Sequence, residues 1–293
     1  MAFCDDTVYW PKDFLLHTIL PLEDPSIGIV GTSKRAHRRG YGEISWSSFW
    51  NFIGCTYLCR RNFEQAASNT IDGQVSTVSG RSLVVRSEIV QDPAFTSAFL
   101  NEHIFFGKIG PLNMGEDKFL TNWIFQKGWK VRIQHLEEAT IMTDLGTFPR
   151  YLKQCLRWSR TSWRNNFCRL CMEYKQLCRK PWSFYTIYTS SLINLAFFYD
   201  AAMLLTLYHG LNAVDLASYL QKEMVMMAFA VWIIATKVVK LIPHFKAYPL
   251  DIFYFPGYVL FAYYYSFQRL YAILTCWDVS WSSRLGVDDY EDH

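Results

Sequence analysis

The chain has 293 residues, a net charge of +3, and 51% hydrophobic and 17% aromatic residues. That length suits either one sizeable core or a smaller core joined to membrane helices. The aromatic share is high for a soluble domain and fits a protein that also meets lipid headgroups, where Trp and Tyr collect. Eight cysteines at irregular spacings argue against a disulfide framework and for a reduced, cytosol-facing protein. Cys168 and Cys171 form a C-x-x-C pair without further ligands at zinc-site spacing, which favours ordinary helix-face cysteines.

The first candidate site residues are Asp5 and Asp6, an acidic pair near the N-terminus. At the end of a strand, two carboxylates can hold Mg²⁺ or Mn²⁺, which neutralises the diphosphate released when a sugar is transferred. Adjacent acidic residues also commonly face solvent or cap a helix. The strands that normally hold the base of a nucleotide do not precede this pair. If the pair belongs to a sugar-nucleotide site, we expect the chain to be a fragment, a truncated gene model or a decayed copy.

Residues 1–146 have the pattern of a mixed domain, and we expect the α/β fold class. The short apolar run 27–31 ends in glycine and predicts a buried strand. Residues 75–90 predict a strand, a turn, a second strand and the start of a helix. Alternation over residues 129–134 predicts an edge strand.

Gly115-Glu116-Asp117 precedes apolar residues that recur at helical spacing, so it marks the start of a helix. In sugar transfer the acceptor hydroxyl loses a proton as it attacks the anomeric carbon, and a carboxylate within reach is the usual general base. An acidic pair stabilised by the helix dipole is the simpler alternative. Taken alone, the tripeptide favours that alternative, so the catalytic interpretation depends on the other motifs.

Residues 147–182 predict amphipathic helices at the membrane surface. Apolar residues form one helical stripe, and an adjacent basic stripe consists of Lys153, Arg157, Arg160 and Arg164. Such a helix suits the headgroup boundary, with its cations near lipid phosphates. An amphipathic helix that packs in a protein core is the alternative.

Gln154, Arg157 and Trp158 form a Q-x-x-R-W motif in this region. Their spacing of i, i+3 and i+4 places all three side chains on one helix face. Arginine pairs with a diphosphate in bidentate fashion, and tryptophan offers a flat apolar platform for a sugar ring. The position of the motif just before long apolar segments makes coincidence improbable.

Residues 183–277 predict transmembrane or interfacial helices. Their apolar segments are 183–208, 224–242 and 252–275. Lys and Arg are dense over residues 150–182, whereas the loop 209–223 holds only one, so the positive-inside rule places the soluble part in the cytosol. Phe255-Pro256-Gly257 interrupts the third segment, and we expect it to follow a re-entrant or interfacial path.

The order of these features carries a family resemblance. The acidic pair, Ser79-Gly80-Arg81, Gly-Glu-Asp, Q-x-x-R-W and the membrane helices follow one another as in processive family 2 glycosyltransferases. The chain resembles hyaluronan synthases and, more closely, their fungal capsule-type polysaccharide synthase relatives, over nearly its whole length. The resemblance implies a partial glycosyltransferase A-type domain, truncated at its N-terminus, followed by interfacial and transmembrane α-helices.

The resemblance also implies residue roles. Asp5 and Asp6 would contact the metal and the diphosphate, and Asp117, beside Glu116, would be the general base. The residues that would bind substrate are Ser79, Gly80, Arg81, Gln154, Arg157 and Trp158. Gly80 would let the backbone approach the acceptor closely.

A further match lies in the C-terminal tail, residues 278–293. Trp281-Ser282-Ser283-Arg284 resembles the Trp-Gly-Thr-Arg gating loop of hyaluronan synthases, so Trp281 and Arg284 would close over the nucleotide. Two serines replace the central Gly and Thr of that motif. Cys4 stands where the family's usual D-x-D motif has its first Asp.

Together these features predict an inverting, metal-dependent hexosyltransferase that polymerises sugar from a UDP-sugar onto a growing polysaccharide. The expected partners are the UDP-sugar, the polysaccharide acceptor and membrane lipid, and no nucleic acid. We expect a multi-pass protein of the plasma membrane with its catalytic part in the cytosol. The alternatives are an inactive truncated paralogue or partner subunit, a non-processive glycolipid transferase, and a transporter that uses Asp200, Lys237 and Arg269.

Overall fold

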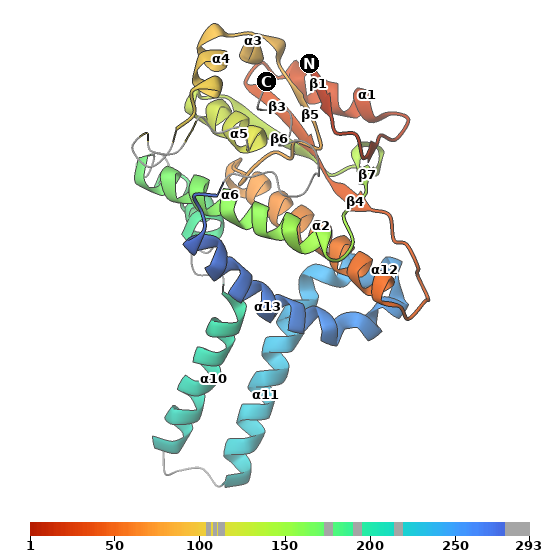
Figure 1. Ribbon diagram of the computed structural model, residues 1–293, viewed down its shortest axis with the longest axis vertical. Coiled ribbons are helices and arrows are strands. Elements are labelled where there is room, and N and C mark those ends of the chain that lie inside the picture. The colour runs from red at the N-terminus through yellow and green to blue at the C-terminus, as the bar shows by residue number, and fades with distance from the viewer. Residues whose placement is uncertain are drawn as a thin grey trace.

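The computed structural model describes residues 1–103, 107, 110, 115–172, 178–189, 195–213 and 219–278. The strands gather in an α/β part, and two long helices project from its opposite end (Figure 1). The mixed α/β class expected from the sequence is confirmed.

The larger sheet has four strands in the order β1-β5-β3-β6. Its strands are β1 (Ala2–Cys4), β3 (Ile27–Thr32), β5 (Ser82–Val85) and β6 (Lys130–Gln134). β3 and β6 are parallel, and the other pairings are antiparallel. β3 is central and almost fully buried, which explains why its sequence is a continuous apolar run. The sheet confirms the buried strand at 27–31 and the edge strand at 129–134.

A second sheet of three strands continues directly from the first. Its strands, in the order β2-β7-β4, are β2 (Val8–Tyr9), β7 (Ile141–Thr143) and β4 (Lys34–Ala36). Ser33 alone separates β3 from β4, and it joins the two sheets. The Ser33 amide donates to Gln134 at the end of β6, and its carbonyl accepts from Ile141 in β7.

Short helices complete the α/β part. They are α1 (Phe14–Ile19), η1 (Leu20–Glu23), α3 (Ser87–Val90), α4 (Pro93–Leu100), α5 (Glu116–Gln126) and η2 (Glu137–Ala139). One core beneath α5 includes Ile29, Val85, Ile124 and Ile133. The helix expected after Gly115 and the strand followed by a helix within 75–90 are therefore present. The first strand expected in 75–90 is absent, because residues 76–81 form a loop whose hydrogen bonds go to the neighbouring helices.

The long helix α2 (Trp46–Asp72) was not identified from the sequence. Ser45 caps its start, since the hydroxyl accepts from the Ser48 amide, and Gly73 ends it with a φ of 77°. The helix runs beside β4 and crosses towards the C-terminal helices (Figure 1). It therefore connects the α/β part to the C-terminal helices.

A second core joins α2 to α6 (Arg150–Met172) and α13 (Phe255–Leu274). Its buried residues are Trp50, Phe52, Ile53, Tyr151, Cys155, Leu241 and Tyr258. α13 begins at the expected break, with Pro256 in its first turn, and lies along α6. Whether it lies at a membrane surface stays a prediction.

The basic stripe of α6 was expected to lie near lipid phosphates. Two of its four residues lie elsewhere. Arg160 pairs with Asp278 at 2.5 Å, and Arg164 donates to the carbonyls of Cys276 and Asp278. Both arginines are buried. They bind residues 275–278, which follow α13, instead of facing lipid phosphates, because α13 lies along α6 and brings this segment over them.

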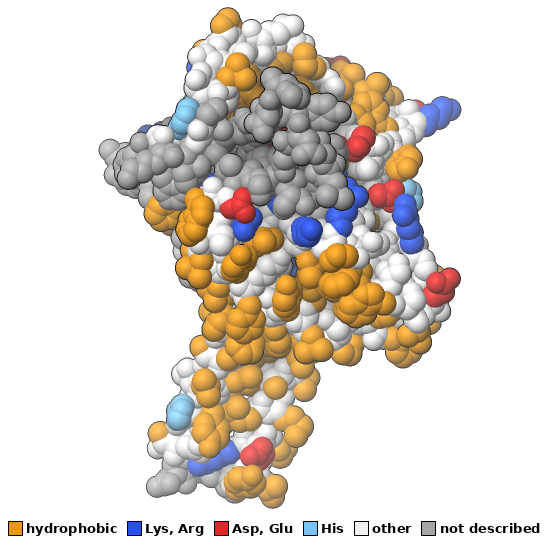
Figure 2. Space-filling model, in the orientation of Figure 1, with side chains coloured by type: hydrophobic (Ala, Val, Ile, Leu, Met, Phe, Trp, Pro, Cys, Tyr) orange, Lys and Arg blue, Asp and Glu red, His pale blue; other side chains and the backbone are white. Residues whose placement is uncertain are grey.

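The projecting hairpin consists of α10 (Ala196–Ala213) and α11 (Tyr219–Val238). Figure 2 shows hydrophobic side chains over most of it on the face in view. Lys237 pairs with Asp200 at 2.5 Å near its base, and Tyr263 of α13 donates to Asp200 at 3.1 Å. Two of the charges expected within the apolar segments, Asp200 and Lys237, thus neutralise one another.

One helix among the described residues, Tyr219–Ala247, is long and apolar enough to cross a membrane. It continues α11 through η4 (Val239–Leu241) and α12 (Ile242–Ala247). It coincides with the second of the three apolar segments expected from the sequence. A multi-pass arrangement stays a prediction.

The remaining described elements are α8 (Pro181–Ser183), η3 (Phe184–Thr189) and η5 (Pro249–Tyr254). A buried ion pair fixes η5 to the α/β part. Asp251 accepts two hydrogen bonds from the Arg38 guanidinium, at 2.8 and 2.6 Å, and lies 2.7 Å from His244 Nε2. Arg38 and Asp251 are almost completely buried, so this contact holds the C-terminal helices against the start of α2.

Candidate active site

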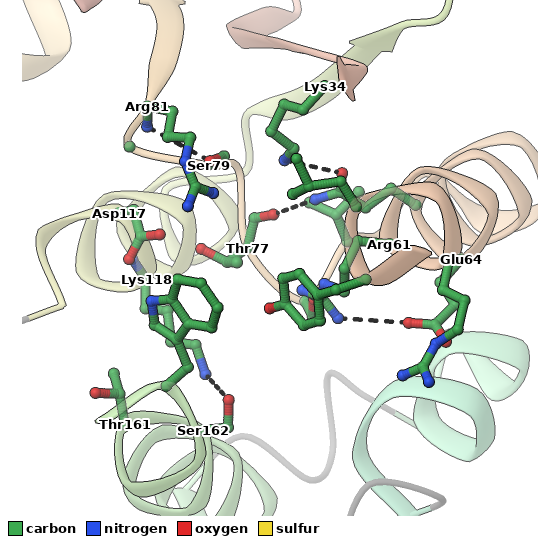
Figure 3. A pocket seen from close by; sticks show the side chains of 18 of the residues that line it. Lys34, Arg61, Glu64, Thr77, Ser79, Arg81, Asp117, Lys118, Thr161 and Ser162 are labelled. Carbon is green, nitrogen blue, oxygen red and sulfur yellow. Dashed lines mark hydrogen bonds and ion pairs between the residues drawn. The ribbon is translucent and has the colours of Figure 1, made fainter. Parts of the chain in front are cut away.

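A cavity of about 980 Å³ lies between α2, the start of α5 and α6. Ten of the twelve candidate site residues line it: Asp5, Asp6, Ser79, Gly80, Arg81, Glu116, Asp117, Gln154, Arg157 and Trp158. Trp281 and Arg284 lie outside the described residues. Segments far apart in the sequence thus converge on one space, shown in part in Figure 3.

Strand pairing places the acidic pair, Asp5 and Asp6, beside the cavity. β1 pairs antiparallel with β5, and just beyond the pairing the Asp5 amide donates to the Arg81 carbonyl at 2.8 Å. This places Asp5 and Asp6 beside Ser79-Gly80-Arg81, although about 75 residues separate them. Both acidic side chains are exposed at the edge of the cavity.

Asp117 lies in the first turn of α5. Gly115 caps that helix with a φ of 107°, a left-handed conformation that glycine adopts readily. The Asp117 carboxylate accepts from the Lys118 amide at 2.8 Å, which anchors it at the helix N-terminus. Gly80 faces it so closely that a Cβ at position 80 would lie 3.3 Å from the Asp117 Cβ.

Glu116 differs from Asp117 in its electrostatic surroundings. Burial, and next the negative charge of Asp117, raise the pKa of the Glu116 carboxyl. The nearby Arg157 acts in the opposite direction with a smaller effect.

The sequence suggested that Trp158 offers a bare, flat platform for a sugar ring. In the structure, two other side chains contact its ring. Its indole stacks on the Tyr57 ring, with ring centres 5.1 Å apart and planes tilted by 11°. The Arg81 guanidinium carbon lies 5.6 Å from the centre of the indole ring. Any sugar that contacts Trp158 would therefore meet Tyr57 and Arg81 as well.

Gln154, the first residue of the Q-x-x-R-W motif, supports a loop. The Gln154 side-chain oxygen accepts from the Gly146 amide at 3.3 Å, at the end of the segment that follows β7. Arg157 lines the cavity on the same helix face. The common face predicted from the spacing is present, but Gln154 also binds the protein backbone.

The cavity residues that come from α2 and β4 were not predicted from the sequence. Tyr57, Arg60, Arg61 and Gln65 come from α2, and Lys34 comes from β4. Arg60 donates to Tyr258 at 2.9 Å and Arg61 to Ser76 at 2.9 Å. The Ser45 cap, the Gly73 stop and the apolar spacing between them are signals that could have identified α2.

Lys34 is a buried cation beside this cavity. Its ammonium donates to Gln65 Oε1 at 3.3 Å. Burial, reinforced by the charges of Arg81 and Arg61, lowers the pKa of Lys34 to about 7, although Asp117 acts in the opposite direction. Figure 3 shows Lys34 and Arg61 on one side of a shared space, and Arg81 beside Asp117 on the other.

The donor groups of the cavity decide whether it can hold a metal ion. In the part of the chain that the structure describes, no three His, Cys, Asp or Glu side chains gather as a metal site. Asp5 and Asp6 offer two carboxylates. Mg²⁺ is commonly held by one or two carboxylates, with substrate phosphates and water completing the shell, so this pair fits a metal that binds together with a diphosphate.

Comparison with known families identifies the family of the chain. The profile described as "Glycosyltransferase like family 2" matches residues 2–161, and "Glycosyl transferase family 21" matches residues 111–253. The first match covers more than half of the chain. The chain therefore belongs to glycosyltransferase family 2, which confirms the enzyme class predicted from the sequence.

Individual relatives show the extent of the similarity. A "Type 2 glycosyltransferase" of Pyricularia oryzae is 34% identical over 289 residues, covering 99% of this chain and 58% of the relative. One from Gibberella zeae is 36% identical over 97% of this chain and 53% of the relative. A "Hyaluronan synthase-related protein" of Xenopus laevis is 23% identical over 82% of this chain and 42% of its own length. The chain spans about half the length of the curated relatives it matches.

Proposed function

We propose that the chain transfers a hexose from a UDP-sugar to a growing polysaccharide, by inversion and with a divalent metal. The observation that carries the proposal is the convergence of ten candidate residues on one cavity, with Asp117 on its wall. Family membership supports nucleotide-sugar transfer. The similarity to a protein named as hyaluronan synthase-related supports a polymerising reaction.

In this mechanism Asp117 accepts the proton of the acceptor hydroxyl as that oxygen attacks the anomeric carbon. Its helix-start position, with the Lys118 amide on one carboxylate oxygen, holds the group in place. Glu116 has a raised pKa because of burial and the adjacent Asp117 charge, so it takes up a proton more readily than an exposed glutamate. We assign the general-base role to Asp117 and a supporting role to Glu116.

The leaving diphosphate would lie between the acidic pair and α6. Asp5 and Asp6 would hold Mg²⁺ or Mn²⁺, which supplies charge neutralisation when bound. Arg157 would pair with the diphosphate oxygens. Arg61 and Arg81 add positive charge to the cavity, as does Lys34 when it is protonated, and this charge lowers the electrostatic energy of an anionic substrate there.

The acceptor sugar would contact Trp158 between Tyr57 and Arg81. Gly80 has no side chain, so its backbone packs directly against Asp117 and leaves the position of that carboxylate undisturbed. Trp281 and Arg284 would close over the nucleotide.

We also propose that the hairpin α10–α11 anchors the protein in a membrane, with the cavity on the cytosolic side. The apolar surface of the hairpin and the candidate span Tyr219–Ala247 support membrane association. The excess of Lys and Arg before the apolar segments supports the cytosolic placement. Several membrane passes and a plasma-membrane location are part of this proposal.

The test is sugar transfer by the full chain purified in detergent. Each of several radiolabelled UDP-sugars would be incubated with the chain, Mg²⁺ and a lipid extract, and the products sized. Products of many sugars are the expected result. Addition of a single sugar to a lipid would indicate the non-processive alternative. Absence of both transfer and UDP binding would indicate the inactive paralogue or partner subunit.

A further inference from the structure

The loop 77–80 lies between α2 and α5, and both helices hold it through buried side chains. It leads directly from the core residue Val78 to Gly80, the residue that backs onto Asp117. The loop has no strand partner of its own, since the structure places residues 76–81 outside the sheets. Its position relative to Asp117 therefore depends on the contacts that the two helices make.

Thr121 makes the contact from α5. Its hydroxyl accepts from the Val78 amide at 2.9 Å and donates to the Asp117 carbonyl at 2.6 Å. Thr121 is fully buried. One hydroxyl thus binds both the loop that carries Gly80 and the residue proposed as the general base.

Gln65 makes the contact from α2 on the other side. Its amide donates to the Thr77 carbonyl at 2.8 Å, and its oxygen accepts from Lys34 at 3.3 Å. Gln65 is also buried. Adjacent residues of the loop are therefore fixed to two different helices, which leaves little freedom for Gly80.

From this geometry we infer that Thr121 is a positioning residue that fixes the acceptor-side loop against Asp117. The inference rests on the proposed function, because it assigns Thr121 a task in presenting the acceptor hydroxyl to that base. Thr121 acts through Val78 and Asp117 and touches no reacting atom. The rate of sugar transfer depends on how the reacting groups are placed, since displacing them by about 1 Å can lower turnover by about 100-fold.

Two substitutions separate positioning from simple packing. Thr121→Val keeps the shape of the side chain but removes the hydroxyl, so both hydrogen bonds are lost. Thr121→Ser keeps the hydroxyl and removes one methyl group. Thr56→Val is a matched control, because Thr56 is also fully buried in a helix but its hydroxyl bonds only to carbonyls of its own helix.

The measurement is kcat and the donor KM for each folded variant, with the folded fraction determined from its melting curve. Thr121→Val is expected to lower kcat by about 10-fold or more, with the donor KM changed by less than roughly two-fold. Thr121→Ser should restore most of kcat. Thr56→Val should leave kcat per folded molecule unchanged although it also lowers the melting temperature.

Hydrogen exchange gives a second measurement that needs no catalysis. The Val78 amide should be protected in the parent chain and in Thr121→Ser, and should exchange faster in Thr121→Val. If Thr121→Val loses this protection but keeps full kcat, Thr121 has only a structural role and the inference is overturned. A parallel loss of kcat in Thr56→Val would overturn it too.

Failure of the proposed function is distinguishable from failure of this inference. If the parent chain transfers no sugar, the proposed function fails and the inference falls with it. If the parent chain is active and Thr121→Val is equally active, only the inference fails.

Discussion

Gly80 and Asp117 lie in such close contact that a Cβ on Gly80 would stand 3.3 Å from the Asp117 Cβ and 3.2 Å from Glu116 Oε1. These contacts are tighter than ordinary van der Waals separation. Gly80→Ala should therefore displace the acidic pair by a few tenths of an ångström and lower turnover by about 10-fold, with a small change in melting temperature. The measurement is kcat for sugar transfer beside thermal unfolding.

Gly210→Ala is the control for that substitution. Gly210 lies in α10 with open space around its Cα, so alanine is accommodated there and favours the helix. Equal turnover in Gly80→Ala and the parent chain would show that the contact with Asp117 does not constrain the reaction.

Asp117→Asn should lower turnover by about 10²–10⁴-fold, because an amide cannot accept the hydroxyl proton. UDP affinity should stay close to that of the parent chain, since the proposed base does not hold the nucleotide. Glu116→Gln is the control and should lose much less activity. Near-normal turnover of Asp117→Asn in a radiolabelled sugar assay would remove Asp117 from the base role.

Sugar transfer should require Mg²⁺ or Mn²⁺. An excess of chelator should abolish transfer, and added Mg²⁺ should restore it, because the two carboxylates of Asp5 and Asp6 need a cation to neutralise a diphosphate. Asp6→Asn should raise the Mg²⁺ concentration needed for half-maximal activity. Transfer that persists in chelator would contradict the metal role of the acidic pair.

Lys34→Met should stabilise the fold at low pH and lose that advantage as the pH rises. The folded pKa of Lys34 is about 7, below its ordinary value of 10.5, because of burial and then the Arg81 and Arg61 charges. Below pH 7 the folded protein holds a buried charge, which costs on the order of a few kcal/mol. Between about pH 7 and 10.5 the folded state has released that proton while the unfolded state keeps it, so the stability of the parent chain rises with pH.

Melting temperatures at pH 6 and pH 9 check this expectation. The gain from Lys34→Met over the parent chain should be larger at pH 6. Lys130→Met removes an exposed lysine from β6 and should show no such dependence. An equal gain at both pH values would mean that Lys34 does not carry a buried charge.

Arg38→Met should destabilise the junction between α2 and η5. It leaves Asp251 buried without its guanidinium partner, a loss of about 3–5 kcal/mol that corresponds to a fall of about 10 °C in melting temperature. Adding Asp251→Leu removes the unpaired charge, so the double variant should melt above the single variant. If the fall in melting temperature of the double variant equals the sum of the falls caused by the two substitutions singly, Arg38 and Asp251 act independently.

Much of the site could be predicted because the chemistry of each motif is local. Residues 154, 157 and 158 share a face because helix periodicity puts them there, and Asp117 lies at a helix start because Gly115 and the following apolar spacing define one. The buried strand β3 and the edge strand β6 were evident from their hydrophobic patterns. The α/β class follows from these same local patterns.

The missed residues lack such local signals of function. Tyr57, Arg61 and Gln65 reach the cavity from a helix whose sequence contains no catalytic motif. Lys34 is an isolated lysine in a three-residue strand. Only the packing of α2 against β4 and α6 makes these side chains part of the site.

By itself, the sequence determined the order of the motifs, the chemical groups that they carry and the enzyme class, because these depend on residue type and short-range spacing. The tertiary structure alone decided which groups meet. Strand pairing brings Asp5 beside Arg81, and α13 buries Arg160 and Arg164 instead of leaving them at a lipid surface. Periodicity tells which residues share a face of a helix, but what covers that face is decided by long-range packing, which no local pattern encodes.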